Sequence, residues 1–267
     1  MNNLDKLKLR LKAWREQAQQ SEMGRHLGPI LRRELYGYFR QPVAYVFLVV
    51  FLLATTGATW YLGEFYQSNE AGLEIFFFFH PWLYLFLIPA VGMRLWSEER
   101  RTGTIELLLT LPVNLLTAVL AKFLAAWAFV GLALLLTFPM VITVYILGHP
   151  DLGAMVTGYL GSLLMAGAYL SITTFTSAIT RNQVISFITS FMVCLIMVLL
   201  GWGVLNESLV QIFPVWLVDV IAAFSFATHF DAIRRGLVDF RDLAYFFSIM
   251  VFMLLATVIV LENRKAN

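Results

Sequence analysis

The side chains best suited to chemistry gather in a short polar segment between two long apolar stretches. The segment begins with four charged residues, Glu98-Glu99-Arg100-Arg101, and Gly103 follows two positions later. Consecutive charges place the end of an apolar stretch at a water interface, and Gly103 permits a sharp turn. The segment therefore predicts a polar junction whose charged side chains can bind another molecule.

A short helix is expected directly after this turn. Thr104 can cap its N-terminus, and Glu106 in its first turn is favourable against the helix dipole. Ile105 and Leu109 share an apolar face, and Pro112 ends the helix. An apolar face flanked by charges suits the docking of a protein partner, with a purely structural turn as the alternative.

The other reactive side chains predict no catalytic, metal or cofactor site. His80, His149 and His229 do not have metal-ligand spacing, and Cys194 is the single cysteine, which removes disulfide frameworks and CxxC motifs. The sequence contains no GxxxxGK[ST] phosphate loop, and no Ser/His/Asp set or paired carboxylates at membrane depth. No chain of acidic and histidine residues crosses the apolar stretches, so proton-driven transport is disfavoured.

Composition excludes a soluble enzyme. The 267 residues are 60% hydrophobic and 13% charged, against about 25% charged in an ordinary soluble domain. The mean hydropathy is +0.76, and the apolar residues form a series of membrane-length runs rather than one core. The sequence therefore predicts an all-α polytopic membrane protein.

Six stretches have the length of a transmembrane helix, which is about 20 residues. They are residues 43–63, 75–96, 116–147, 153–179, 184–205 and 243–261. Residues 209–228 are expected to form a re-entrant or interfacial pair of helices broken near Pro214. A seventh full span at 209–226 is the alternative, but it would bury Asp219 and move the C-terminal Arg264 and Lys265 to the opposite side.

Lysine and arginine in the connections predict the orientation. Residues 1–42 hold nine Lys and Arg against four Asp and Glu, whereas residues 64–74 and 149–151 hold no Lys or Arg. By the positive-inside rule, the N-terminal region and the C-terminal tail lie in the cytoplasm. The domain organisation is then a cytoplasmic and interfacial region, 1–42, followed by a transmembrane domain, 43–267.

The N-terminal region contains two helical patterns. Residues 4–20 predict a basic amphipathic helix that could lie on anionic lipid, although Met23 could equally start translation and make it dispensable. A second pattern, from Leu27 to Phe39, has an apolar stripe, with Arg32, Arg33 and Glu34 expected to point away from it. The second pattern predicts an interfacial helix that leads into the first span.

Three features of the apolar stretches have mainly structural interpretations. The run of residues 76–79, all Phe, is expected to contact lipid. Lys122 near the start of the third span is expected to anchor the helix at the interface, with its amine extended to the cytoplasm. Asp219 could line the exit of a pathway, although helix capping or simple exposure is as well supported.

The polar segment resembles the signature of the permease subunits of type-2 ABC transporters, the ABC-2 family. That signature comprises Glu-Glu-Arg, Gly-Thr, Glu, Leu-Leu and Leu-Pro, and the chain carries all of them between 98 and 112. Lys122 is similar to the lysine of a Gly-Lys pair in the gliding-motility and nitrous-oxide-reductase-maturation types, with Ala121 in place of the glycine. Weaker matches are residues 32–35, His80-Pro81 and residues 229–239. Ser225-Phe226 departs from the family's Ser-Pro pair.

The resemblance implies six transmembrane helices with a cytoplasmic coupling helix and re-entrant outer helices. In this family two permease subunits, identical or different, work with two ATPase subunits, and the coupling helix sits in a cleft of the ATPase. ATP and Mg would then be bound by the partner and not by this chain. The residues implied as ATPase contacts are Glu98, Glu99, Arg100, Gly103, Glu106 and Leu109.

The expected function is therefore that of a permease subunit of an ATP-driven exporter in a bacterial cytoplasmic membrane. Members of the family also transmit force to extracytoplasmic accessory proteins, and no nucleic-acid partner is expected. The few charges within the spans favour a lipidic, peptide or mechanically coupled cargo. The alternative is a membrane scaffold that recruits a cytoplasmic partner through residues 98–112 and moves no substrate.

Overall fold

The computed structural model describes residues 27–67, 72–106, 114–148, 150–203, 210–211 and 213–265. This part of the chain is helical and contains no strand. Residues 27–39 form an N-terminal helix. The elements after it are α2 (Pro42–Gly57), the π-helical turn η1 (Ala58–Leu62), α3 (Glu74–Phe78), α4 (His80–Gly92), α5 (Ser97–Thr102), α7 (Leu115–Leu135), α8 (Phe138–Leu147), α9 (Leu152–Ile179), α10 (Gln183–Leu199), α12 (Val215–Ala222), α13 (Phe226–Arg234) and α14 (Phe240–Lys265).

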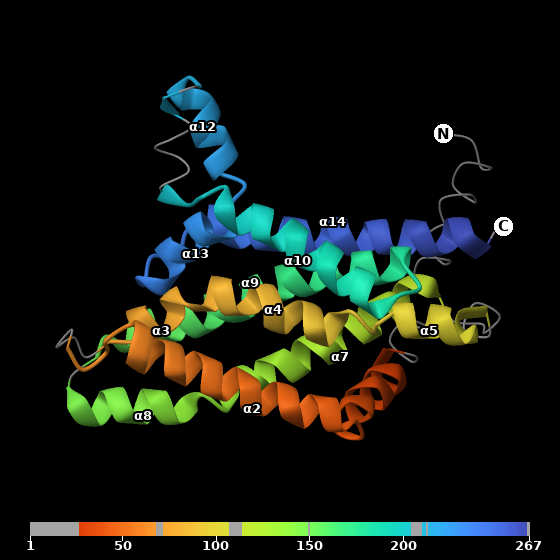
Figure 1. Ribbon diagram of the computed structural model, residues 1–267, viewed down its shortest axis with the longest axis horizontal. Coiled ribbons are helices and arrows are strands. Elements are labelled where there is room, and N and C mark those ends of the chain that lie inside the picture. Colours follow the sequence, from red (N-terminus) through yellow and green to blue (C-terminus); the bar gives the residue numbers. More distant parts are fainter. Residues whose placement is uncertain are drawn as a thin grey trace, which may run out of the picture.

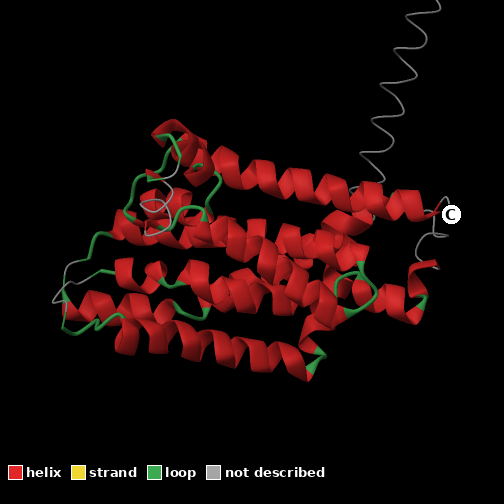
Figure 2. Ribbon diagram, turned by 45° about the horizontal axis from the view of Figure 1, so that its top comes forward, coloured by secondary structure: helices red, strands yellow, loops and turns green. Residues whose placement is uncertain are grey.

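The long helices lie along one axis and form a bundle. In Figure 1, α2, α4, α7, α9, α10 and α14 run along the long axis of the molecule, and the turned view in Figure 2 shows the same bundle. α5 and the C-terminal end of α14 lie at one end, called here the α5 end. α3, α8 and α13 lie at the opposite end, called here the α3 end. The helices thus hold two groups of polar residues at opposite ends of the bundle.

α9 is the central helix, in contact with α4, α7, α10, α13 and α14. Small residues allow this close packing, because a glycine lets a neighbouring helix approach the backbone. A Cβ atom added at Gly158 would lie 2.3 Å from the ring of Phe77, and one at Gly161 would lie 2.4 Å from Ile233. Any displacement of α9 must therefore be shared with the helices around it.

The membrane-protein class is confirmed, whereas the count of six spans stays a prediction. In the described residues four helical segments are long and apolar enough to cross a membrane: Pro42–Leu62, Leu115–Leu147, Leu152–Ile179 and Phe240–Asn263. α10 is apolar but shorter, with 17 residues. The second predicted span is divided into α3, α4 and α5, with Pro89 inside α4.

A helix begins directly after Pro214, where the sequence predicts a break, because Pro214 caps the start of α12. A second break was not expected: α12 and α13 are bent by 71° between Ala222 and Phe226. Ser225 sets the bend because its side chain accepts a hydrogen bond from the backbone of Ala227 and so caps α13. α12 projects away from the bundle in Figure 1 and carries Asp219 in an exposed position.

The expectation that residues 76–79 contact lipid is wrong for two of the four phenylalanines. Phe76 and Phe77 are each 1% exposed, whereas Phe78 is 51% exposed. The ring of Phe77 packs against Gly158 of α9 and against the ring of Tyr159, with centroids 5.1 Å apart. Hydropathy cannot separate the two cases, since an aromatic ring is favourable both in lipid and in a protein core.

Candidate functional site

α5 is attached to the end of the central helix α9 through Ser177 and Arg100. The hydroxyl oxygen of Ser177 accepts hydrogen bonds from the backbone N–H groups of Trp96 and Ser97, both at 3.0 Å. The same hydroxyl donates to the carbonyl of Met93 at 2.9 Å, and Arg100 donates to the carbonyl of Ala178 at 2.6 Å. The start of α5 is therefore fixed to the last turn of α9 on both sides.

The turn after α5 has the geometry that the sequence predicts. Gly103 has a φ of 76°, in the left-handed region that favours glycine, and it ends α5. The hydroxyl of Thr104 bonds with that of Thr102 at 3.0 Å, and residues 104–106 begin the next helical turn. Glu106 is exposed there, and Leu109 lies outside the described residues. The assignment of these residues as ATPase contacts stays a prediction.

Lys122 is buried, so its expected role as an anchor with an amine in the cytoplasm is wrong. The residue is 4% exposed, and its Nζ lies 2.7 Å from Oε1 of Glu99 and 3.2 Å from Oε2 of Glu34. The amine also lies over the ring of Trp96, 5.4 Å from its centroid. We call Lys122, Glu34 and Glu99 the Lys122 cluster. It joins α7, the N-terminal helix 27–39 and α5.

Glu34 was expected on the outer, polar face of the N-terminal helix, but it points inward. Its side chain is 20% exposed, and its Oε1 accepts from Arg33 at 2.7 Å. Burial alone raises the pKa of Glu34, but the charge of Lys122 and the hydrogen bonds from Arg33 and Lys122 outweigh it, so the pKa lies below its ordinary value. Glu34 is therefore ionised and bound at neutral pH, whereas Arg32 and Arg33 are exposed.

A cavity of about 210 Å³ opens beside the Lys122 cluster. Glu98 lines it together with Glu34, Glu99 and Lys122, and so does Arg94, which donates to Gln41 at 3.0 Å. The structure thus brings together Glu98 and Glu99 from the polar segment with Glu34 of the N-terminal helix. Sequence analysis missed this arrangement because Glu34 and Lys122 are distant in the chain, and only the weak family matches at both positions pointed to them.

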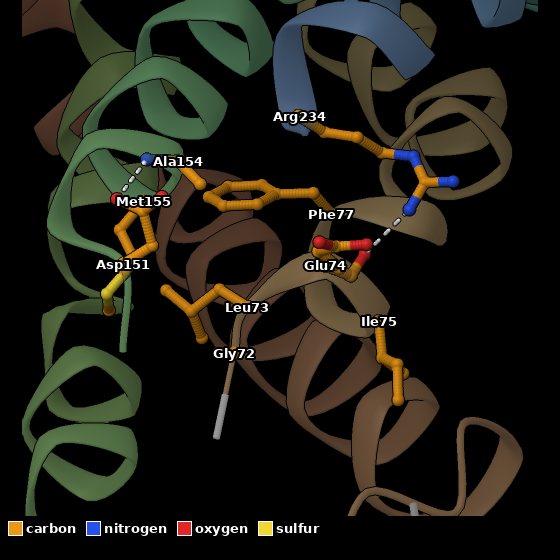
Figure 3. A pocket seen from close by; sticks show the side chains of 9 residues that line it. All are labelled: Gly72, Leu73, Glu74, Ile75, Phe77, Asp151, Ala154, Met155 and Arg234. Atoms are coloured by element: carbon orange, nitrogen blue, oxygen red, sulfur yellow. Dashed lines mark hydrogen bonds between the residues drawn. The ribbon is translucent and has the colours of Figure 1, made fainter. Parts of the chain in front are cut away.

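A second polar group lies at the α3 end, around Arg234. Arg234, Glu74 and Phe77 line a cavity of about 270 Å³ here, and Figure 3 shows them with the other side chains around it. Arg234 pairs with Asp231, and it donates to the carbonyl of Glu74 at 3.3 Å. A neighbouring cavity of about 370 Å³ is also lined by Arg234, mostly with aromatic and apolar side chains. Arg234 therefore separates two cavities whose chemistry is mainly apolar.

The part of the chain that the structure describes contains no group of three or more His, Cys, Asp or Glu side chains that could hold a metal ion. His80 is fully buried among aromatic rings, with those of Phe76 and Tyr84 at 4.6 Å and 5.3 Å between centroids. The polar groups at both ends hold helices together through hydrogen bonds and ion pairs.

The comparison with protein families agrees with this arrangement. The sequence model described as ABC-2 family transporter protein matches residues 12–262. No curated protein matches the chain. The matched range includes the N-terminal helix, α5, the Lys122 cluster and both helices of the bent pair. The chain belongs to the ABC-2 transporter family, and it is a multi-pass membrane protein of ABC-type transport.

Proposed function

We propose that this chain is the permease subunit of an ATP-driven ABC-2 exporter and that a separate ATPase subunit docks at the α5 end. The α5 end then faces the cytoplasm of a bacterium, with both termini on that side. The attachment of α5 to Ser177 and Ala178 carries the proposal, because it connects the predicted docking segment directly to the central helix. ATP and Mg are bound by the partner.

The geometry supports a simple path for mechanical coupling. A push on residues 97–106 reaches α9 through the hydrogen bonds of Ser177 and Arg100. The same push reaches α7 and the N-terminal helix through the Lys122 cluster, because Glu99 is on α5. At the other end, α9 packs directly against α13 and α14. ATP-driven movement at one end is thereby delivered to the polar group around Arg234.

The permease is expected to act as a dimer, either with itself or with a second permease. The mostly apolar cavities at the α3 end favour a lipidic or peptide cargo, or a force passed to an accessory protein outside the membrane. The alternative scaffold function requires docking at α5 but no coupling. The two functions therefore differ in whether cargo changes the ATPase rate.

Charge reversal at Glu106 tests the proposal. The tagged full chain is purified in detergent with its ATPase, and association and cargo-stimulated hydrolysis are measured. Glu106→Lys should weaken association at least tenfold, since it reverses a charge at the exposed helix start. Glu262→Lys is the matched control, because Glu262 is an exposed acid on α14, outside the docking segment. Unchanged association and stimulation in Glu106→Lys would refute the docking site.

A further inference from the structure

The α12–α13 break is held by a histidine with two oxygen partners. His229 Nδ1 lies 2.6 Å from Oδ1 of Asp242, and its Nε2 lies 2.9 Å from the carbonyl oxygen of Ala223. The ring stacks on Tyr245 with centroids 3.9 Å apart. The hydroxyl of Tyr245 in turn donates to the carbonyl of Phe224 at 2.5 Å. Two successive carbonyls of the break are thus bonded to side chains.

Both oxygen partners accept hydrogen bonds, so the arrangement requires two protons. A neutral imidazole carries one N–H and can donate to only one of the two oxygens. We assign the second proton to the ring, so that an imidazolium faces the Asp242 carboxylate, because the short 2.6 Å contact suits a charge-assisted hydrogen bond. Loss of either proton leaves two acceptors facing each other at one of the contacts, which is repulsive.

From this proton count we infer that His229 is a proton-dependent latch that positions the α12–α13 break. With both protons present, the ring joins Asp242 at the start of α14 to the carbonyl of Ala223 at the end of α12. When the pH rises and the ring becomes neutral, one of these bonds is lost. The bond from Tyr245 to the carbonyl of Phe224 remains, but α12 is held less firmly and can move. The inference concerns the position of α12 alone and holds whether or not the chain is coupled to an ATPase.

In the part of the chain that the structure describes, few other side chains hold α12, so its position depends on this latch. Among its residues only Val218 is buried, whereas Val215, Trp216 and Val220 are more than half exposed. α13, in contrast, packs on α9, α10, α3 and α14, and Ser225 donates to the carbonyl of Val198 on α10. A change at His229 should therefore move α12 and leave α13 in place.

Few other ionisable groups adjoin the ring. On α14, Asp242 and Tyr245 contact it directly, and Arg241 precedes Asp242 in the chain. The remaining ionisable residues on the helices packed against α13, and on α13 itself, are Glu74, Tyr159, Tyr169, Cys194, Asp231 and Arg234, together with Glu262, Arg264 and Lys265 at the C-terminal end of α14. Asp231 and Arg234 pair with each other. The His229 side chain is 17% exposed, so protons from the surrounding water can reach it.

¹⁵N NMR spectroscopy on the full chain in lipid bilayers can show directly how many protons the His229 ring carries. The four histidines are labelled with ¹⁵N, and the His229 signal is assigned by its loss in His229→Leu. The ring should carry two protons wherever the distance distribution described below is narrow, and one proton wherever that distribution is broad. In Asp242→Asn, the amide can donate to Nδ1 while Nε2–H still donates to Ala223. That variant should therefore keep both contacts of the ring when the ring is neutral.

The position of α12 is measured in parallel by spin labels at Val220→Cys and Leu160→Cys, which replace exposed residues on α12 and α9. Cys194 is fully buried and should not react with the label, and dilution with unlabelled chain removes distances between copies. The distance distribution should be narrow at low pH and broaden at high pH in the wild-type chain. It should be broad at every pH in His229→Leu and narrow at every pH in Asp242→Asn.

A label pair at Leu160→Cys and Met192→Cys, on α9 and α10, is the control and should not respond to pH. The latch is refuted if His229→Leu gives the wild-type distribution, or if the ring is singly protonated while the distribution is narrow in the wild-type chain. Persistence of the wild-type pH response in Asp242→Asn would equally refute it.

Discussion

Lys122 and Glu34 are separated by 88 positions in the chain, yet the Nζ of one lies 3.2 Å from Oε2 of the other. Glu99 binds the same amine at 2.7 Å. One buried cation thus connects the N-terminal helix, α5 and α7. Because α5 is also bonded to α9, the predicted docking segment is connected to helices on both of its sides.

Removal of the buried cation should destabilise the fold more than removal of the whole cluster. Lys122→Met keeps the length of the side chain but leaves Glu34 and Glu99 without their cation. We expect a loss of roughly 3 kcal/mol, the lower end for a buried pair, because the two carboxylates are 20% and 21% exposed. The apparent unfolding temperature in detergent measures it.

The matched comparison is the triple variant Lys122→Met, Glu34→Gln and Glu99→Gln, which removes all three charges together. It should recover most of the loss, since no buried charge is left unpaired; Arg33, which loses Glu34 as its partner, is exposed. If Lys122→Met unfolds at the wild-type temperature, the Lys122 cluster does not contribute to stability.

Acid should weaken the cluster through Glu34. The pKa of Glu34 is lower in the folded chain than its ordinary value of 4.5, which is taken for the unfolded chain. Its contribution to stability is therefore complete above pH 4.5 and is lost as the pH falls through the folded pKa. Unfolding temperatures measured from neutral pH downward should show a smaller acid-induced drop in Glu34→Gln. Equal drops in both chains would contradict this prediction.

Close packing on α9 should make Gly158 intolerant of a methyl group. A Cβ at Gly158 would lie 2.3 Å from the buried Phe77 ring, so Gly158→Ala should cost about 1 to 3 kcal/mol by overpacking. Gly57→Ala is the control, because no atom lies within 4 Å of a Cβ there. Addition of Phe77→Leu to Gly158→Ala should restore stability, and failure to do so would locate the strain elsewhere.

Hydropathy predicted the long helices because it depends only on residues that are close together in the chain. The predicted spans 43–63, 116–147 and 153–179 differ by one residue at most from the observed Pro42–Leu62, Leu115–Leu147 and Leu152–Ile179. The breaks between helices were harder to predict, since each break depends on a single capping residue. Ser225 caps α13 and Phe226 takes the first helical position, the place where the family's proline would be favourable. The departure from Ser-Pro thus preserves the cap.

Contacts between distant residues could not be read from one sequence. Glu34 lies among arginines in a pattern that favours an exposed face, and nothing near it specifies Lys122 as its partner. Phe77 is apolar and suits lipid as well as it suits α9. The polar segment 98–106 was recognisable because charges, a glycine and a threonine follow one another in the chain, but its attachment through Ser177 and Ala178 was not.

The hydrogen bonds between α5 and α9 should decide whether docking of the ATPase is converted into movement of α9. Ser177→Ala removes the acceptor of the Trp96 and Ser97 N–H groups while leaving the exposed face of residues 103–106 unchanged. We expect the ATPase to remain associated and cargo stimulation of hydrolysis to fall about tenfold, which corresponds to about 1.4 kcal/mol. Steady-state ATPase rates with and without cargo measure this.

Ser171→Ala is the control for this prediction, since Ser171 is buried on the same helix but donates only to Ala168 within α9, at 2.8 Å. It should retain cargo stimulation. If Ser177→Ala also retains full stimulation while Glu106→Lys abolishes association, docking occurs at the predicted segment but the movement does not pass through Ser177. The Lys122 cluster and the bond from Arg100 to Ala178 would then be the connections left to carry it. If the cluster carries it, Lys122→Met should lose stimulation at temperatures where it is still folded.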